Sequence, residues 1–242
     1  MASIRARRHA PALLAAGLLL AGCLPEAVTR EGRSISALYD FVLLLALAVT
    51  GLVWGLLTFA VLRYRRRRQQ TEAGSLPAQT GGNVALEAVW TVVPLLTIFA
   101  LFGLTLITLD DVDRRQPGEP VELHVEAFRW GWRMSYPAEQ VTVDGFAEPG
   151  PQAVVPVGQP LLITLTSRDV VHAFYVPQFL YKRDAIPGRD EVFELTIEHE
   201  GTYRGQCAEF CGLFHARMPF SIRAVPAGEY EAWVAEQQAA GE

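Results

Sequence analysis

Two long apolar stretches dominate the first half of the chain. Residues 41–62 contain no charged side chain, and residues 88–109 repeat this pattern with Pro94 inside the stretch. At 1.5 Å per residue, each stretch is long enough to cross a hydrocarbon core of about 30 Å. Their length and the lack of a polar face exclude a pair of soluble core helices. The pattern therefore predicts two transmembrane helices, over about 39–62 and 86–109.

Beyond residue 115 the pattern changes to short segments of β character, separated by glycine and proline. Apolar and β-branched residues concentrate, with partial alternation, in residues 121–128, 161–167, 191–197 and 220–225. Such segments predict the strands of a compact sandwich or barrel. Residues 226–240 predict a closing helix, because a proline stands near its start and its apolar side chains fall on one side.

The N-terminus has the pattern of an export signal. Three arginines precede an apolar run over residues 10–21, and the chain then reads Leu-Ala-Gly-Cys over residues 20–23. Small residues before a cysteine resemble a bacterial lipobox, so Cys23 is expected to become the lipid-modified first residue of the mature chain. The alternative is an ordinary signal in which the cysteine is incidental.

These segments predict three parts of the chain. We expect a lipoprotein-type signal peptide over 1–22, an N-terminal segment with the transmembrane hairpin over 23–115, and an extracytoplasmic domain over 116–242. The arginine cluster at residues 63–68 lies between the two apolar stretches, and arginine-rich loops of this kind stay in the cytoplasm. We therefore expect a two-pass protein of the bacterial inner membrane, with its C-terminal domain on the periplasmic side.

Composition and charge narrow the class of partner. Of the 242 residues, 50% are hydrophobic and 19% are charged, which excludes a disordered chain. Residues 110–242 carry 11 Lys and Arg against 21 Asp and Glu, a net charge of −10. This charge argues against nucleic acid and favours a cationic protein partner, whose attraction would weaken as salt rises.

Residues 205–219 contain the strongest chemical signal. Glycines and a proline indicate a loop between two strands, and a loop can surround a metal from several sides. Thiolate, imidazole and thioether together favour copper over hard cations such as Mg²⁺. The candidate ligands in this loop are Cys207, Cys211, His215 and Met218.

Three other interpretations compete with a pair of copper ions. The two cysteines could form a disulfide in an oxidising compartment. Zinc would use both cysteines and two histidines but leave Met218 without a role. Blue copper needs only one cysteine. Two bridging thiolates suit two coppers, and His172 is the best candidate for the second imidazole.

Four segments resemble subunit II of the haem-copper cytochrome c oxidases. They are residues 87–94 (EAVWTVVP), 167–174 (SRDVVHAF), 182–189 (KRDAIPGR) and the loop 207–218. The similarity extends from about Ser36 to Trp233. It implies an α+β membrane protein in which the two-helix transmembrane hairpin is followed by a cupredoxin-like Greek-key β-sandwich.

The resemblance implies a dinuclear copper centre of the CuA type in this sandwich. Its ligands would be the bridging thiolates of Cys207 and Cys211, the imidazoles of His172 and His215, the thioether of Met218 and the backbone carbonyl of Glu209. The side chain of Glu209 would reach a Mg²⁺ or Mn²⁺ ion shared with subunit I, and carboxylates suit such hard cations. The alternative for this side chain is a solvated loop acid.

The resemblance also implies where the electron enters. Residues 128–132 (FRWGW) match an aromatic segment in which an exposed tryptophan receives the electron from the donor haem, and Trp130 is the candidate. The alternative for an aromatic cluster after a strand is ordinary core packing, and Trp132 is the candidate for that role. The chain departs from the family pattern at Arg129, where an amide is common, and at Gly131, where another aromatic is common. Both departures fall on the surface expected to meet the donor.

Glu87 stands at the cytoplasmic edge of the second apolar stretch. In the family, an acid at this position lies at the mouth of a proton path into subunit I. The alternative is an interfacial carboxylate that reaches back to water, and a glutamate near a helix start is also favoured by the helix dipole.

The sequence therefore predicts the membrane-anchored subunit II of a proton-translocating terminal oxidase. We expect it to accept electrons from cytochrome c and pass them to haem in subunit I, where oxygen is reduced to water, in a complex with subunit III and membrane lipid. We expect a separate donor protein, because no C-x-x-C-H motif is present. The alternatives are a copper subunit of another respiratory enzyme, such as a nitric oxide reductase, and a stand-alone copper-binding lipoprotein. A quinol oxidase subunit is disfavoured because such chains lack the copper ligands.

Overall fold

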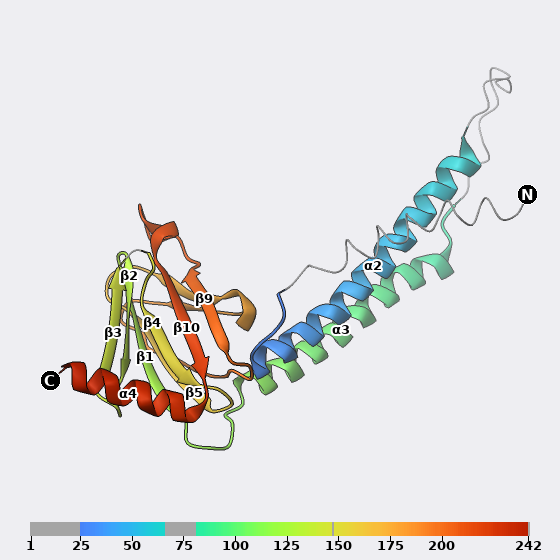
Figure 1. The fold of residues 1–242 in the computed structure, drawn as a ribbon. Helices are drawn as coiled ribbons and strands as arrows, with labels where there is room; N and C mark the ends of the chain where they lie inside the picture. Colours follow the sequence, from blue (N-terminus) through green and yellow to red (C-terminus); the bar gives the residue numbers. More distant parts are fainter. Residues whose placement is uncertain (1–24, 66–80, 147, 242) are drawn as a thin grey trace, which may run out of the picture. The chain divides into compact units, whose positions relative to one another are not determined.

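The structure, a computed structural model, describes residues 25–65, 81–146 and 148–241 (Figure 1). The expected signal peptide, Cys23 and the arginines at positions 66–68 lie outside these residues. The chain divides into two compact units. One unit contains the described residues up to Ser36 together with those from Val112 onward, and the other contains Ala37–Asp111.

The second unit consists of two long apolar helices. Helix α2 (Arg30–Tyr64) and helix α3 (Val84–Asp113) each contain a window of mean hydropathy 2.4, and none of either window is buried by protein. Asn83 caps α3, because its Oδ1 accepts hydrogen bonds from the backbone N–H groups of Ala85 and Leu86, at 3.1 and 3.2 Å. These helices have the length and the apolar surface of a membrane hairpin.

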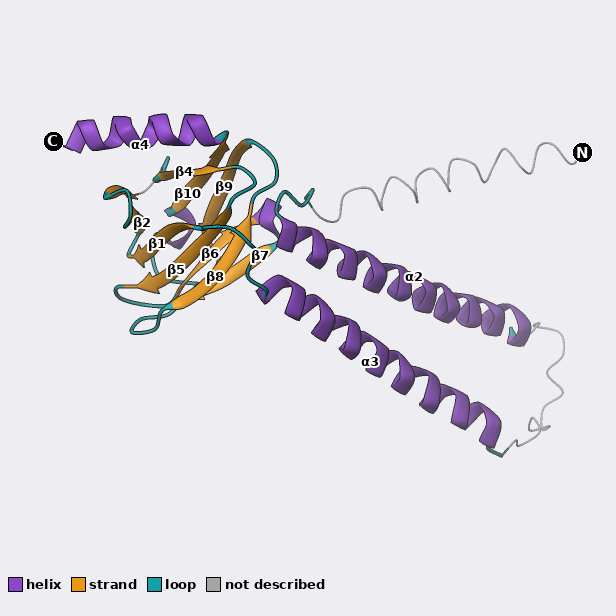
Figure 2. Ribbon diagram, turned by 90° about the horizontal axis from the view of Figure 1, so that it is seen from below, coloured by secondary structure: helices purple, strands orange, loops and turns teal. Residues whose placement is uncertain are grey.

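The first unit is a sandwich of two five-stranded sheets (Figures 1 and 2). The first sheet has the order β3-β2-β1-β5-β8, from β1 (Val121–Phe128), β2 (Gly131–Tyr136), β3 (Val141–Phe146), β5 (Pro160–Ser167) and β8 (Glu191–Thr196). The second has the order β4-β10-β9-β6-β7, from β4 (Gln152–Pro156), β6 (His172–Val176), β7 (Tyr181–Ala185), β9 (Gly201–Cys207) and β10 (Pro219–Val225). The short helices η1 (Pro177–Phe179) and η2 (His215–Arg217) and helix α4 (Ala227–Gly241) complete the unit.

A hairpin of two apolar helices followed by a β-sandwich confirms the predicted fold class. The four strand segments expected from hydrophobic pattern are β1, β5, β8 and β10, and the closing helix is α4. In β1 the burial alternates along the strand, as expected when one face packs on a core. The sequence does not predict the other six strands, because their hydrophobic pattern is weak. For example, β7 reads YKRDA, which contains three charged residues.

Strand direction gives the sandwich two distinct ends. Strand β1 runs parallel to β5, so Ala127 pairs with Ser167 at one end. Strand β6 starts at this end, and its partner β9 finishes there. We call this end the ligand end, because the candidate metal ligands belong to it. Helix α4 follows β10, which finishes at the opposite end of the sandwich.

The segment that precedes the first apolar stretch is part of the sandwich. The backbone N–H of Val28 donates to the carbonyl of Gln178 at 3.1 Å, and the N–H of Glu198 donates to the carbonyl of Val28 at 2.9 Å. Thr29 forms a β-bridge with Ile197. These backbone contacts add a short N-terminal segment to the sandwich. We call this segment, residues 28–32, the strap.

Glu31 fastens this strap through a buried carboxylate. Only 1% of its surface is exposed, and its Oε2 accepts a hydrogen bond from the backbone N–H of Thr196 at 3.0 Å. The neighbouring Gly32 lies so close to the chain that an added Cβ would meet the carbonyl oxygen of Phe179 at 2.6 Å. The strap therefore depends on an acid and a glycine at adjacent positions.

We predict that Glu31→Ala destabilises the sandwich unit by about 1–3 kcal/mol, because the partly buried N–H of Thr196 loses its acceptor. Hydrogen exchange of the Thr196 amide, measured by mass spectrometry on the full chain in detergent, should accelerate. Glu31→Gln keeps an acceptor and should lose less protection, and Glu26→Ala, at an exposed position, should lose none. Unchanged exchange in Glu31→Ala would contradict this role.

Candidate metal centre

The candidate ligands come from two neighbouring strands and the loop that follows one of them. His172 is the first residue of β6 and Cys207 is the last residue of β9. The two strands pair with Phe174 opposite Cys207, so the imidazole and the thiol lie side by side. Cys211 follows in the β9–β10 loop, and all three side chains are buried. Their ligand atoms lie within 4.8 Å of one another.

The loop brings the remaining candidates to the same place in two matching sets. The Sγ of Cys207 lies 3.8 Å from Nδ1 of His172 and 3.3 Å from the carbonyl oxygen of Glu209. The Sγ of Cys211 lies 3.6 Å from Nδ1 of His215 and 3.4 Å from Sδ of Met218. Each thiol therefore has one imidazole and one weak donor beside it.

The two cysteines are not joined. Their sulfur atoms lie 3.9 Å apart, whereas a disulfide bond is about 2.05 Å long. If two metal ions were bound, Cys207 and Cys211 would hold them together with the imidazole and the weak donor beside each thiol. The residues present thus fit the donor chemistry of copper, which takes thiolate, imidazole and weak axial ligands.

The two thiols differ strongly in acidity. Burial raises the pKa of Cys207, but hydrogen bonds from His172 and from the backbone of Glu209 outweigh it and bring the pKa to about 7. Burial and the neighbouring Cys207 raise the pKa of Cys211 to about 12. The surroundings thus lower the pKa of one thiol and raise that of the other. A bound cation would make both thiolates favourable, because metal binding displaces their protons.

Asp169 orients the imidazole of His172. Its Oδ1 lies 3.0 Å from Nε2 of His172, which leaves Nδ1 on the side of the sulfur. Burial raises the pKa of Asp169, but hydrogen bonds from His172 and from the backbone N–H of Arg129 outweigh it and lower the pKa to about 2. A carboxylate in this position fixes the orientation of a ligating histidine. Sequence reasoning did not single out Asp169, although its position three residues before His172 was visible.

Trp132 supports the other half of the loop from the core. Its indole is fully buried, lies against Phe220 with ring centroids 5.0 Å apart, and donates from Nε1 to the carbonyl oxygen of Met218 at 2.9 Å. This hydrogen bond positions the backbone of a candidate ligand. His124 and His199 are exposed and lie outside the cluster.

Trp130 belongs to the β1–β2 turn and packs against the β9–β10 loop, which carries several of the candidate ligands. It is partly buried and not fully exposed, and its ring packs edge-on against Phe214 with centroids 4.9 Å apart. The indole also covers Gly212, where an added Cβ would meet Cζ2 of Trp130 at 3.4 Å. Gly212 has a φ of +120°, a conformation that favours glycine. The indole therefore lies beside Gly212, the residue that follows Cys211.

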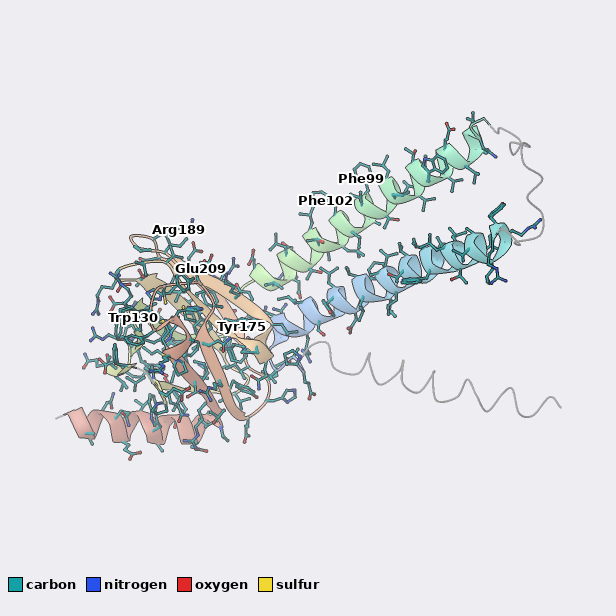
Figure 3. The ribbon with its side chains drawn as sticks, turned by 90° about the horizontal axis from the view of Figure 1, so that it is seen from above. Phe99, Phe102, Trp130, Tyr175, Arg189 and Glu209 are labelled. Atoms are coloured by element: carbon teal, nitrogen blue, oxygen red, sulfur yellow. The ribbon has the colours of Figure 1, made fainter. Side chains whose placement is uncertain are left out.

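The carboxylate of Glu209 points away from the sulfurs. Its Oε2 accepts a hydrogen bond from Nζ of Lys182 at 3.3 Å, and Lys182 also pairs with Asp184 at 3.0 Å. The side chain is partly exposed at the surface of the sandwich (Figure 3). Glu209 thus offers its carbonyl to the cluster and its carboxylate to the exterior.

Glu87 belongs to the helical unit and not to this cluster. It lies in the first turn of α3, is exposed, and accepts a hydrogen bond on its backbone carbonyl from the hydroxyl of Thr91 at 2.8 Å. Its surroundings within the described residues are those of a helix terminus.

Comparisons with known proteins identify the family of the chain. The family model of the transmembrane domain of cytochrome c oxidase subunit II matches residues 18–106, and that of its periplasmic domain matches residues 139–225. A probable cytochrome c oxidase subunit 2 of Streptomyces avermitilis is 33% identical over 276 residues, covering 93% of this chain and 85% of the relative. Cytochrome c oxidase subunit 2 of Cereibacter sphaeroides is 29% identical, covering 83% of this chain and 74% of the relative.

A solved structure also matches. The periplasmic domain of subunit II of cytochrome oxidase of Bradyrhizobium japonicum is 33% identical in sequence, covers 51% of this chain and 96% of that chain, and has a TM-score of 0.48. The names of the relatives do not favour a nitric oxide reductase subunit or a stand-alone lipoprotein. Taken with the two matching family models, the similarity to these relatives shows that the chain belongs to the cytochrome c oxidase subunit II family.

Proposed function

We propose that this chain is the electron-entry subunit of a haem-copper oxidase and holds two copper ions between Cys207 and Cys211. The observation that carries the proposal is the paired arrangement of donors, in which each thiol has its own imidazole and its own weak donor. A single copper would leave one thiol, one imidazole and one weak donor without a function. Zinc would leave Met218 unused.

When bound, the copper pair supplies one-electron redox chemistry, and the protein contributes geometry and exclusion of water. His172 and Cys207 are buried on paired strands, so the positions of their side chains change little when the centre gains or loses an electron. Asp169 holds the imidazole of His172, and Trp132 holds the backbone of Met218. A rigid site of this kind suits rapid electron transfer because few atoms must move.

The electron is proposed to enter through Trp130 from cytochrome c and to leave toward haem in subunit I, where oxygen is reduced to water. Support comes from the position of the indole against Gly212, one residue from Cys211. Assembly with subunits I and III follows the organisation of the family that the sequence resembles.

Two acids are proposed to serve the partner subunit. The carboxylate of Glu209 faces away from the sulfurs and suits a Mg²⁺ or Mn²⁺ ion shared with subunit I, where it would exchange Lys182 for a hard cation. Manganese EPR of the assembled complex would test this site. Glu87, in the first turn of α3, is proposed to stand at the entry of a proton path into subunit I, the role that the family resemblance implies for an acid at this position. Loss of proton pumping in Glu87→Gln, with electron transfer retained, would test this role.

The membrane arrangement completes the proposal. The arginines at 63–68 between the two apolar helices favour a cytoplasmic loop, which places the sandwich on the periplasmic side of the inner membrane. The signal peptide over 1–22, lipid attachment at Cys23 and the domain boundaries near residue 115 remain sequence-based parts of this proposal. Acyl labelling of the chain tests the lipid attachment.

We predict two copper ions per chain in the full chain purified in detergent, with an EPR signal in which one unpaired electron couples equally to both nuclei. Cys207→Ser and Cys211→Ser should each abolish this signal, because each removes a proposed bridge. Cys23→Ser serves as the matched control and should leave the signal intact. One copper per chain, or bound zinc after copper loading, would show that the proposed function is wrong.

We predict that Asp169→Ala weakens copper binding by about 10–100-fold, the usual cost of losing the partner of a ligating histidine. Competition with a copper chelator measures this affinity. Asp190→Ala, at an exposed position outside the cluster, is the control and should not change it. Equal affinity in both variants would show that Asp169 does not position His172.

We predict that Trp130→Phe strongly slows reduction of the copper centre by cytochrome c, since the smaller ring covers less of the loop at Gly212. Stopped-flow absorbance measures this rate. The copper EPR signal and reduction by ascorbate should not change, because the ligands are untouched. Trp233→Phe in α4 is the matched control, and a rate equal to that of Trp130→Phe would exclude entry through Trp130.

A further inference from the structure

The indole of Trp130 (Figure 3) is held without a hydrogen bond. Its Nε1 is buried and has no hydrogen-bond partner within the part of the chain that the structure describes. The indole of Trp132, by contrast, donates from Nε1 to the carbonyl oxygen of Met218 at 2.9 Å. A hydrogen bond fixes the direction of a ring, whereas apolar packing is not directional. The orientation of Trp130 therefore depends on the groups that its ring contacts.

The two residues next to Trp130 in the chain do not support its ring. Arg129 directs its guanidinium to Asp169, with Nε 3.4 Å from Oδ2. Gly131 has no side chain, and an added Cβ there would meet the carbonyl oxygen of Gly145 at 2.4 Å. Contacts that hold the indole therefore come from other segments of the sandwich.

The β9–β10 loop supplies such contacts from two of its residues. The ring of Phe214 meets the indole of Trp130 edge-on, with ring centroids 4.9 Å apart and an angle of 87° between the planes. Gly212 leaves room for the indole, since an added Cβ would lie 3.4 Å from Cζ2 and 3.6 Å from Nε1 of Trp130. Aromatic pairs favour this edge-to-face geometry. Phe214 is thus the side chain of the loop against which the indole packs.

The backbone of Phe214 is fixed at the start of η2. Its carbonyl oxygen accepts a hydrogen bond from the N–H of Arg217 at 2.8 Å, and the N–H of His215 donates to the carbonyl of Gly212 at 3.1 Å. Phe214 directly precedes His215, one of the candidate copper ligands. The same turn therefore carries a metal ligand and the ring that contacts the indole.

We propose that Phe214 is a positioning residue for electron entry, which holds the indole of Trp130 against the loop of the copper ligands. The proposal rests on the proposed function, because it concerns the route by which the electron reaches the copper centre. Phe214 acts through the indole and not by binding the donor. Its side chain is 39% exposed, so the test must separate these two roles.

Phe214→Ala removes the edge contact and leaves space into which the indole can turn. Loss of one edge-to-face pair changes the balance between two orientations by about 2- to 10-fold. We therefore expect reduction of the copper centre by mitochondrial cytochrome c, measured by stopped-flow absorbance on the purified oxidase complex, to slow by about this factor. Phe214→Tyr keeps the aromatic edge and should restore the rate. Reduction by ascorbate and the copper EPR signal should not change, because the ligands are untouched.

Leu213→Ala is the matched control. Leu213 precedes Phe214 on the same loop and is 81% exposed, so the variant removes apolar surface without removing the aromatic contact. It should leave the rate unchanged within experimental error. Equal slowing in Leu213→Ala and Phe214→Ala would show that the apolar area of the loop sets the rate, and would overturn the proposal.

A double-mutant cycle separates positioning of the indole from direct contact with the donor. If Phe214 acts through the indole, adding Phe214→Ala to Trp130→Phe should slow the reaction little beyond Trp130→Phe alone. If the two effects multiply in full, Phe214 serves the donor directly and the proposed role is wrong.

Fluorine NMR reports the orientation of the indole without a protein donor. We expect the full chain, labelled with 5-fluorotryptophan and reduced in detergent, to give a sharp resonance that Trp130→Phe removes. This resonance should broaden or split in Phe214→Ala, as the indole samples a second orientation, and stay sharp in Phe214→Tyr and Leu213→Ala. A single sharp resonance in Phe214→Ala would show that the indole keeps its place without Phe214.

The copper EPR signal distinguishes failure of this role from failure of the proposed function. Loss of the signal in Phe214→Ala alone would show that Phe214 holds the metal loop and not the indole, which contradicts the proposal. Absence of the signal in the unaltered complex would overturn the copper function itself.

Discussion

The register between β6 and β9 is the constraint on which the metal centre depends. It sets Phe174 opposite Cys207. This pairing brings His172, at the start of β6, beside the thiol of Cys207, at the end of β9. A shift by one residue would turn each side chain to the opposite face of its sheet. The buried rings of Trp132, Phe174 and Phe220 pack together behind the site and stabilise this register.

The loop after β9 adds a second set of donors that is similar to the set at the end of β9. Cys207 belongs to the strand and Cys211 to the loop, yet each sulfur meets an imidazole and a weak donor. Gly212, with its positive φ, turns the chain after Cys211 and leaves room for Trp130. The same few residues thus determine both the metal site and the position of the aromatic ring beside it.

Asp169 connects this site to the exterior surface. One oxygen of its carboxylate contacts His172, and the other accepts the backbone N–H of Arg129 at 2.8 Å. The residue next to Trp130 is therefore fixed by the same carboxylate that orients a metal ligand. A change at Asp169 is therefore felt both at His172 and at the backbone beside Trp130.

The sequence by itself determined the apolar helices, the strands with regular hydrophobic pattern and the donor set from Cys207 to Met218, because these signals are local. The weakly patterned β7, the role of Asp169 and the Lys182 contact of Glu209 came only from the tertiary structure. The position of β7 and the contact of Lys182 with Glu209 depend on residues that are distant in the chain and meet through strand pairing. Asp169 lies only three residues before His172, but its other oxygen accepts a hydrogen bond from the backbone N–H of the distant Arg129. The ion pairs are the clearest case, since the sum of −10 follows from the sequence, but the pairing of Arg168 with Glu126 and of Arg129 with Asp169 is decided by which strands lie side by side.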